Sequence, residues 1–191
     1  GALLATVTFT DAPDGFNYTL EGLIFNQDPN VNGNWTTGNV CQGGGGCYTE
    51  GDDVPSRLTI TGLTNGNSYS VVIQHDYDDG SGQLGYLSFH NDSPVVADIG
   101  AIGATISYIS PDVSCGSSNT CKNYTLSFTA TAPTAIIYWD SLLSLDAADW
   151  SGASLHFRLE SGIGGENVGN KEVPIQVNQI FFLLVILKFL H

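Results

Sequence analysis

Apolar and polar residues alternate in short stretches along most of this chain. The stretches are rich in β-branched and aromatic residues, and clusters of Gly, Asn, Asp and Pro separate them. A period of two is typical of half-buried strands, and no stretch of useful length shows apolar residues at helical spacing. The pattern predicts strands near residues 3–9, 18–24, 58–60, 69–77, 85–89, 104–109, 124–129, 135–139, 155–159 and 173–177.

Ten or more short antiparallel strands with turn signals between them indicate an all-β fold, either a β-sandwich or a jelly roll. We expect one domain over residues 1–178, within which residues 1–10 form an N-terminal strand that is free to be exchanged, and an apolar C-terminal strand or tail over residues 179–191. The glycine-rich stretch 26–54 predicts a long surface loop. Residues 140–150 fit either a short helix or a loop with one helical turn.

The two terminal segments are the most apolar parts of the pattern. In the N-terminal segment one strand face is made by Leu3, Ala5, Val7 and Phe9. Residues 180–187 are apolar without a break, which is too short for a transmembrane helix of about 20 residues but fits a strand buried on both faces or a truncated anchor. We expect the assembly contacts here to be made by Ile180, Phe181, Phe182, Leu184 and Ile186.

Charge narrows the classes of partner. The chain has 191 residues and a net charge of −14, with only five Lys and Arg residues. Nucleic-acid binding needs clustered basic side chains, so we exclude it and expect no binding to an anionic membrane surface. The share of charged residues is 13%, which is low for a soluble domain, and Gly, Asn, Ser and Thr replace them, as extracellular β proteins favour.

The cysteines fall into two pairs with the same spacing. Cys41 and Cys47 enclose five residues, as do Cys115 and Cys121. Four cysteines allow three connectivities, and the matching spacing favours pairing within each loop, worth about 2 kcal/mol each. A zinc site would need closer pairs or histidines at fixed offsets. We therefore expect two disulfides and a secreted protein at the cell surface.

Two further features fit export. The sequence contains no methionine, so we expect that a segment such as a signal peptide precedes Gly1 in the gene product. Asn-x-Ser/Thr sequons permit N-glycosylation in a secreted protein. They occur at Asn17, Asn34, Asn91 and Asn123.

An acidic turn is the leading candidate metal site. Asp76, Asp78 and Asp79 precede a glycine turn, and closely spaced carboxylates suit Ca²⁺, which takes six to eight oxygen ligands. The spacing resembles the start of an EF-hand loop, but the twelfth position is Leu87, which offers no carboxylate. An acidic, solvated hairpin loop explains the same residues, and both interpretations stay open.

Catalytic signatures are missing from the sequence. It has no Gly-x-Ser-x-Gly motif, no Cys/His arrangement and no phosphate-binding glycine loop. A glycosidase would need two facing carboxylates, and no pair stands out among the 19 acidic residues. We expect no enzymatic activity. Trp35, in the long loop, is the candidate for an exposed ring that stacks on a sugar, whereas Trp139 ends an apolar strand and is expected in the core.

Two segments resemble known families. Residues 63–71, Leu-Thr-Asn-Gly-Asn-Ser-Tyr-Ser-Val, are similar to the Leu-x-x-Gly-x-x-Tyr-x-Val segment of fibronectin type III domains. The resemblance implies that Tyr69 lies at the corner between sheets and bonds back to the backbone. Residues 139–171 resemble the end of a group of secreted prokaryotic cell-surface β-domains that have no established catalytic residues.

These observations together predict a structural subunit of an extracellular filament or surface assembly, a homopolymer joined by strand exchange. A head-to-tail contact of this kind propagates instead of closing. The alternative is a carbohydrate-binding or adhesin module for surface glycans, with or without calcium. A secreted hydrolase is a third hypothesis, which would require an acidic cleft.

Overall fold

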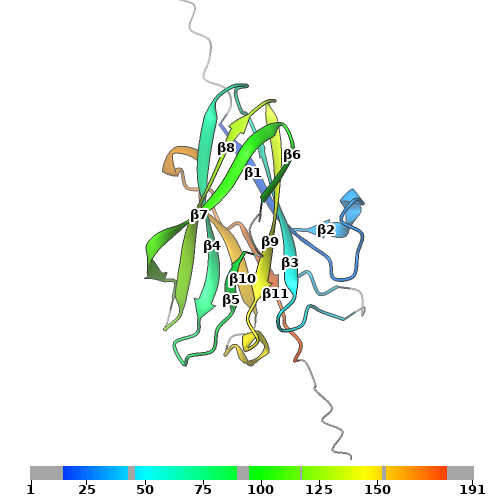
Figure 1. The fold of residues 1–191 in the computed structure, drawn as a ribbon, viewed down its shortest axis with the longest axis vertical. Helices are drawn as coiled ribbons and strands as arrows, with labels where there is room; N and C mark the ends of the chain where they lie inside the picture. The colour runs from blue at the N-terminus through cyan, green and yellow to red at the C-terminus, as the bar shows by residue number, and fades with distance from the viewer. Residues whose placement is uncertain (1–14, 43–45, 90–94, 117, 152–153, 180–191) are drawn as a thin grey trace, which may run out of the picture.

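The computed structural model describes residues 15–42, 46–89, 95–116, 118–151 and 154–179. They form two antiparallel sheets, whose strands run along the long axis of the molecule (Figure 1). This confirms the predicted all-β sandwich. The predicted assembly residues 3–9 and 180–186 lie outside the described residues.

The first sheet has the strand order β2-β1-β3-β9-β5. These strands are β1 (Asn17–Leu23), β2 (Trp35–Thr36), β3 (Asp53–Thr61), β5 (Tyr86–Phe89) and β9 (Thr134–Leu143). A further strand, β6 (Val95–Ile99), also pairs with β9. Since β3 occupies one side of β9, β5 and β6 follow one another along its other side.

The second sheet has the order β11-β10-β4-β8-β7. Its strands are β4 (Ser68–Asp78), β7 (Ala101–Ser114), β8 (Thr120–Ala130), β10 (Leu155–Ser161) and β11 (Glu172–Ile175). In Figure 1 β7 lies at one flank of the sandwich and β2 at the other. β7 and β8 form a hairpin closed by the second cysteine loop, and β10 and β11 form another.

The core lies between the sheets, because alternate residues of each strand point inward. Burial follows this period of two in β8, β9 and β10. Each fully buried large aliphatic or aromatic side chain contributes about 1.5–3 kcal/mol through removal from water. The fully buried set draws on both sheets and includes Leu58, Ile60, Ile73, Leu126, Ile137 and Phe157.

The chain passes from the first sheet to the second at Gly100, the one residue between β6 and β7. Gly100 has a φ of +70°, in the left-handed region that favours glycine. A Cβ at this position would lie 1.8 Å from the carbonyl oxygen of Thr134. The crossing therefore requires glycine on two independent grounds.

The described helical turns are short. They are η1 (Asn32–Asn34), η2 (Ala147–Asp149) and η3 (Ile163–Gly165). Residues 140–150 thus form the end of β9 and a loop with one helical turn, which is one of the two structures expected for them. Among the described residues, no helix has the length and apolar character needed to cross a membrane.

Candidate functional site

Among the described strands, the edge strand β7 has the most exposed large apolar side chains. It pairs with β8 on one side, and within the described part of the chain no strand pairs with its other side. An unpaired edge presents backbone N–H and C=O groups that can pair with another chain. Its large apolar residues are unusually exposed, at 59% for Ile102, 47% for Tyr108 and 37% for Ile109.

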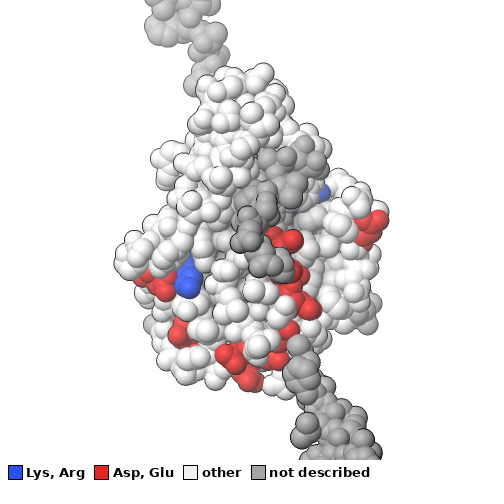
Figure 2. All heavy atoms as spheres, in the orientation of Figure 1, with Lys and Arg blue, Asp and Glu red and all other residues white. Residues whose placement is uncertain are grey.

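Charged side chains do not protect most of this edge. Soluble proteins usually block a long edge with lysine, with proline or with bulges. β7 has no charged residue from Ala101 to Pro111, and its one acid is Asp112. Figure 2 shows one face of the molecule, in the orientation of Figure 1. Acidic side chains gather over its lower half, whereas no charged side chain is visible at its upper end, where β8 ends.

The edge is regular only in its middle. The pairing with β8 is in register from Thr105 to Ile109, and it shifts between Ile102 and Thr105 and again between Ile109 and Val113. Pro111 lies within the second irregular stretch. Between the bulges, residues 105–109 thus form a regular segment, about as long as a short strand, with which another chain can pair.

The inner side of this edge is partly apolar. Ala104 and Ile106 pack against the core cluster but remain partly exposed. The Tyr108 ring lies 5.8 Å from the Tyr124 ring, with the Lys122 ammonium 5.9 Å from the centre of the Tyr108 ring. A strand added beside β7 would bury the exposed parts of these side chains, which favours pairing through the hydrophobic effect.

The two terminal segments join the sandwich at opposite ends. β1 begins at Asn17, which pairs with Thr61 at the end of β3. Asn178 forms a bridge with Thr49, and Gln179 donates to Asp149 beside η2, near the opposite end of β3 and β9. The two ends of the described chain therefore lie at opposite ends of the sandwich.

The outer face of the second sheet holds a network of buried charge. The pairing places His156, Asp76 and Cys121 in one cross-strand row, and Glu172, Arg158, Gln74 and Asn123 in the next. Arg158 donates to Asp76 at 2.5 Å and to Glu172 at 3.2 Å, while the backbone N–H of His156 donates to Asp76 at 2.8 Å. These bonds join β10 to β4 and to β11 across three strands.

The carboxylate of Asp76 remains ionised in this network. Burial alone would raise its pKa, but the hydrogen bonds from His156 and Arg158 and the charge of Arg158 outweigh burial and hold the pKa below its usual value. Hence Asp76 and Arg158 form a buried ion pair, in which the Asp76 side chain is 4% exposed.

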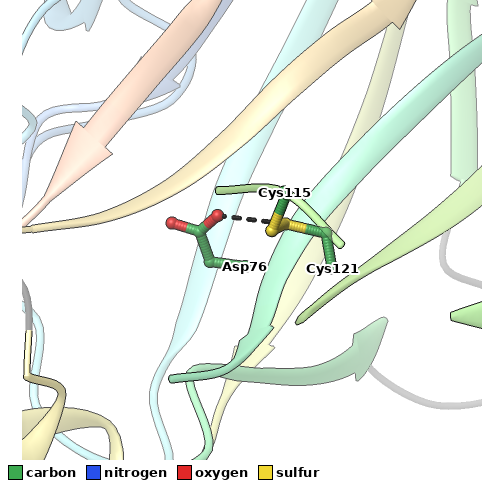
Figure 3. Close-up of side chains that lie close together, drawn as sticks. All are labelled: Asp76, Cys115 and Cys121. Carbon is green, nitrogen blue, oxygen red and sulfur yellow. Dashed lines mark hydrogen bonds between the residues drawn. A yellow bond between two sulfur atoms is a disulfide. The ribbon is translucent and has the colours of Figure 1, made fainter. Parts of the chain in front are cut away.

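Figure 3 shows the disulfide Cys115–Cys121 lying over Asp76, with Cys121 Sγ 3.3 Å from Asp76 Oδ1. The three side chains are close enough together to share a metal ion. However, metal binding by cysteine requires a thiolate, and both sulfurs here are joined in a disulfide. The arrangement is therefore a structural clamp on the carboxylate and not a metal centre.

The three aspartates of the predicted calcium site have separate partners. Asp76 is bound to Arg158 and His156, as above, and Asp78 accepts from the N–H of Gly80 at 2.6 Å. Asp79 is buried, accepts from Ser81 and Gln83, and reaches the N–H of Ser151 at 3.1 Å. The hydrogen bonds of Asp79 outweigh burial and hold its pKa well below the usual value. Calcium binding stays a prediction, and these bonds show that Asp78 and Asp79 fix the turn.

Trp35 is not the exposed ring that the sequence suggested. It is 7% exposed and donates through Nε1 to the carbonyl of Pro29 at 3.0 Å. The guanidinium of Arg57 lies 4.7 Å from the centre of its ring, and Tyr138 meets it edge-on at 5.5 Å. The long loop folds back onto the first sheet because this tryptophan packs on its outer face. The expectation for Trp139 is met, at 2% exposure.

The cysteines, the sequon asparagines and Tyr69 are the remaining positions that the sequence predicted. Both expected disulfides are present, Cys41–Cys47 and Cys115–Cys121, and they are compatible with an extracellular protein. Of the sequon asparagines, Asn17 is exposed, Asn34 donates to the carbonyl of Asp28, and Asn123 accepts from Gln74. Asn91 lies outside the described residues. The backbone N–H of Thr64 donates to the Tyr69 hydroxyl at 2.8 Å.

His75 makes the stability of the fold depend on pH. It is fully buried among Tyr86, Phe89 and Tyr124, and burial lowers its pKa to about 3, although Asp76 acts in the opposite direction. Between about pH 6.5 and pH 3 the unfolded chain therefore binds a proton at His75 that the folded chain does not. The free energy of unfolding should fall in this window as the pH is lowered, by up to about 1.4 kcal/mol per pH unit.

Denaturant titrations of the wild type and of His75→Gln across this window measure the effect. The wild type should lose stability below pH 6.5, and the variant should show a flatter profile. The contribution of Asp76 lies lower, since a depressed carboxylate pKa supplies stability above the unfolded value of 3.8 and loses it below. Equal slopes for the two proteins would show that His75 is not the group responsible.

No family model, curated protein or solved structure matches this chain. The fibronectin type III-like segment and the likeness to secreted prokaryotic surface domains stay predictions. The residues that the sequence did not single out are Arg57 and Tyr138. Alternation with the apolar Leu155, Phe157 and Leu159 placed His156 on the outer face beside Arg158, but it did not reveal their partner Asp76.

Proposed function

We propose that the chain is a structural subunit of an extracellular filament or surface assembly, in which a strand of one copy adds to the open edge of the next. The observation that carries the proposal is β7, an edge strand with exposed Ile102, Tyr108 and Ile109 and no charge in its first eleven residues. An extended segment that pairs with such an edge satisfies its own backbone and covers the apolar side chains.

The segment we assign to this edge is residues 3–9 of a neighbouring copy. It has one apolar face, made by Leu3, Ala5, Val7 and Phe9. A strand at the edge of a sandwich has one face toward the core and one toward water, so an alternating segment fits it. Residues 180–187 are apolar on both faces and match this position less well.

Other properties of the chain support this assignment. Residues 3–9 and β7 are different parts of the chain, so strand addition between copies gives a head-to-tail contact that repeats from copy to copy. The disulfides and the low share of charged residues, 13%, suit a protein outside the cell. The buried ion pair of Asp76 and Arg158 joins β4 to β10, and β4 is the strand that pairs with β8.

A lysine placed in the regular part of β7 tests the edge. Ile109→Lys should reduce the polymerised fraction strongly, because a lysine on an edge strand disfavours the addition of another strand and loses part of its contact with water when one pairs beside it. The matched control is Leu145→Lys, which makes the same change at a residue that is 71% exposed and outside the sheets. Light scattering after size-exclusion chromatography measures the masses. Equal loss of polymer in both variants, or in neither, would contradict the use of this edge.

A further inference from the structure

The outer face of the first sheet contains a groove. The charge network lies on the other sheet, and no residue of β7 lines this groove. Its volume is about 720 Å³, within the range of small-molecule sites. The residues that line it are Pro29, Asn30, Asn32, Arg57, Ile99, Ile136 and Tyr138. They come from the long loop before β2, from β3 and β9, and from the end of β6.

The floor of this groove is built by two adjacent cross-strand rows. Glu21, Arg57 and Tyr138 are direct neighbours in register across β1, β3 and β9. The next row brings Ile136 beside Ile99 at the edge of the sheet. Inward-facing residues of the same strands form the core, so these outward-facing ones are available to line a surface site.

The polar part of the floor is held rigid. Arg57 donates through Nε to Glu21 at 2.7 Å, and its guanidinium lies over the buried ring of Trp35. The edge contact between Trp35 and Tyr138 fixes the Tyr138 ring beside it. Trp35 thus supports the groove from below. A site whose side chains are already fixed loses little conformational entropy when a ligand binds.

We propose that this groove binds a neutral saccharide. A sugar ring presents an apolar C–H face and a rim of hydroxyl groups that both donate and accept hydrogen bonds. The groove offers the Tyr138 ring and Ile136 to the apolar face, and the amides of Asn30 and Asn32 with the Arg57 guanidinium to the hydroxyls.

The ligand is neutral because the charges of the site and of the protein disfavour an acidic sugar. Glu21 compensates Arg57 at 2.7 Å, so the groove has no uncompensated cation from this residue. The whole chain has a net charge of −14, which repels an anionic ligand at long range. Hydrogen bonding and stacking are left as the means of recognition.

Saturation-transfer NMR and calorimetry on the full chain test the assignment with four probes: cellotriose, maltotriose, mannotriose and a trisaccharide of glucuronate. At least one neutral trisaccharide should bind, and Tyr138→Ala should weaken it about tenfold, since an aromatic contact is worth about 1.4 kcal/mol. The matched control is Tyr77→Ala, which removes a half-buried tyrosine from β4 of the other sheet and should leave binding unchanged.

Asn32→Ala provides a second variant in case Tyr138→Ala does not fold. Asn32 is an exposed residue of η1, so its replacement should leave the fold intact. It should weaken the same trisaccharide severalfold. Absence of binding by every neutral probe, wild-type affinity in both groove variants, or tighter binding of the glucuronate trisaccharide would overturn the proposal. None of these outcomes bears on polymerisation, because the groove and β7 are tested by different variants.

Discussion

Gly100→Ala is expected to abolish the folded state or to lower its free energy of unfolding by about 4 kcal/mol or more. The left-handed φ of +70° costs an L side chain about 1–2 kcal/mol. The larger cost is steric, because the new methyl group would lie 1.8 Å from the Thr134 carbonyl oxygen, which belongs to the first residue of β9. Relief would require separating β6 and β7 from β9 at the connection where the chain passes from β6 in the first sheet to β7 in the second.

Gly103→Ala separates these two causes. Gly103 also has a positive φ, +62°, but a Cβ there would meet no atom within 4 Å. It should therefore lose only the backbone contribution of about 1–2 kcal/mol. Guanidinium titrations followed by tryptophan fluorescence and circular dichroism give both values. Similar losses in the two variants would mean that the crossing at Gly100 tolerates a side chain.

Asp76→Ala should cost about 3 kcal/mol, the second largest effect we expect. It leaves Arg158 with Glu172 and Gln74 as partners and removes the acceptor of the His156 backbone N–H. A buried cation that loses its counter-ion is destabilising mainly through the desolvation that is no longer compensated. Arg158 is 21% exposed, so water can compensate for part of the loss.

Two comparisons make the Asp76 result specific. Asp78→Ala removes a neighbouring carboxylate whose bond to Gly80 is exposed, and it should cost less than about 1 kcal/mol. The double variant Asp76→Ala/Arg158→Met removes both charges and should recover part of the stability lost by the single variant. A single variant no less stable than Asp78→Ala would show that the network contributes little to folding.

Alternation along the chain was sufficient to predict the fold, because burial in a sandwich is decided residue by residue. Leu126 and Phe128 are buried as their period-two pattern indicates, and the second disulfide closes the hairpin before them. The open edge was harder to foresee. The pattern predicted a strand only over 104–109, since Gly103 and Pro111 interrupt it, whereas β7 extends from Ala101 to Ser114.

The sequence did not predict side-chain partners that lie far apart along the chain. Asp76 resembled a calcium ligand within its own turn, but its main partner Arg158 lies 82 positions away and on another strand. Trp35 was expected to be exposed because its loop is polar, yet Arg57 and Tyr138 cover it from β3 and β9. Sequence neighbours predict local structure, but strand order decides which side chains meet.

Electron microscopy of the purified chain, with and without residues 1–9, tests the central claim most directly. If copies join by strand addition at β7, the full chain forms filaments or other polymers, and the shortened chain remains as single folded sandwiches. Monomers from the full chain at every concentration, or the same polymers from both chains, would contradict it.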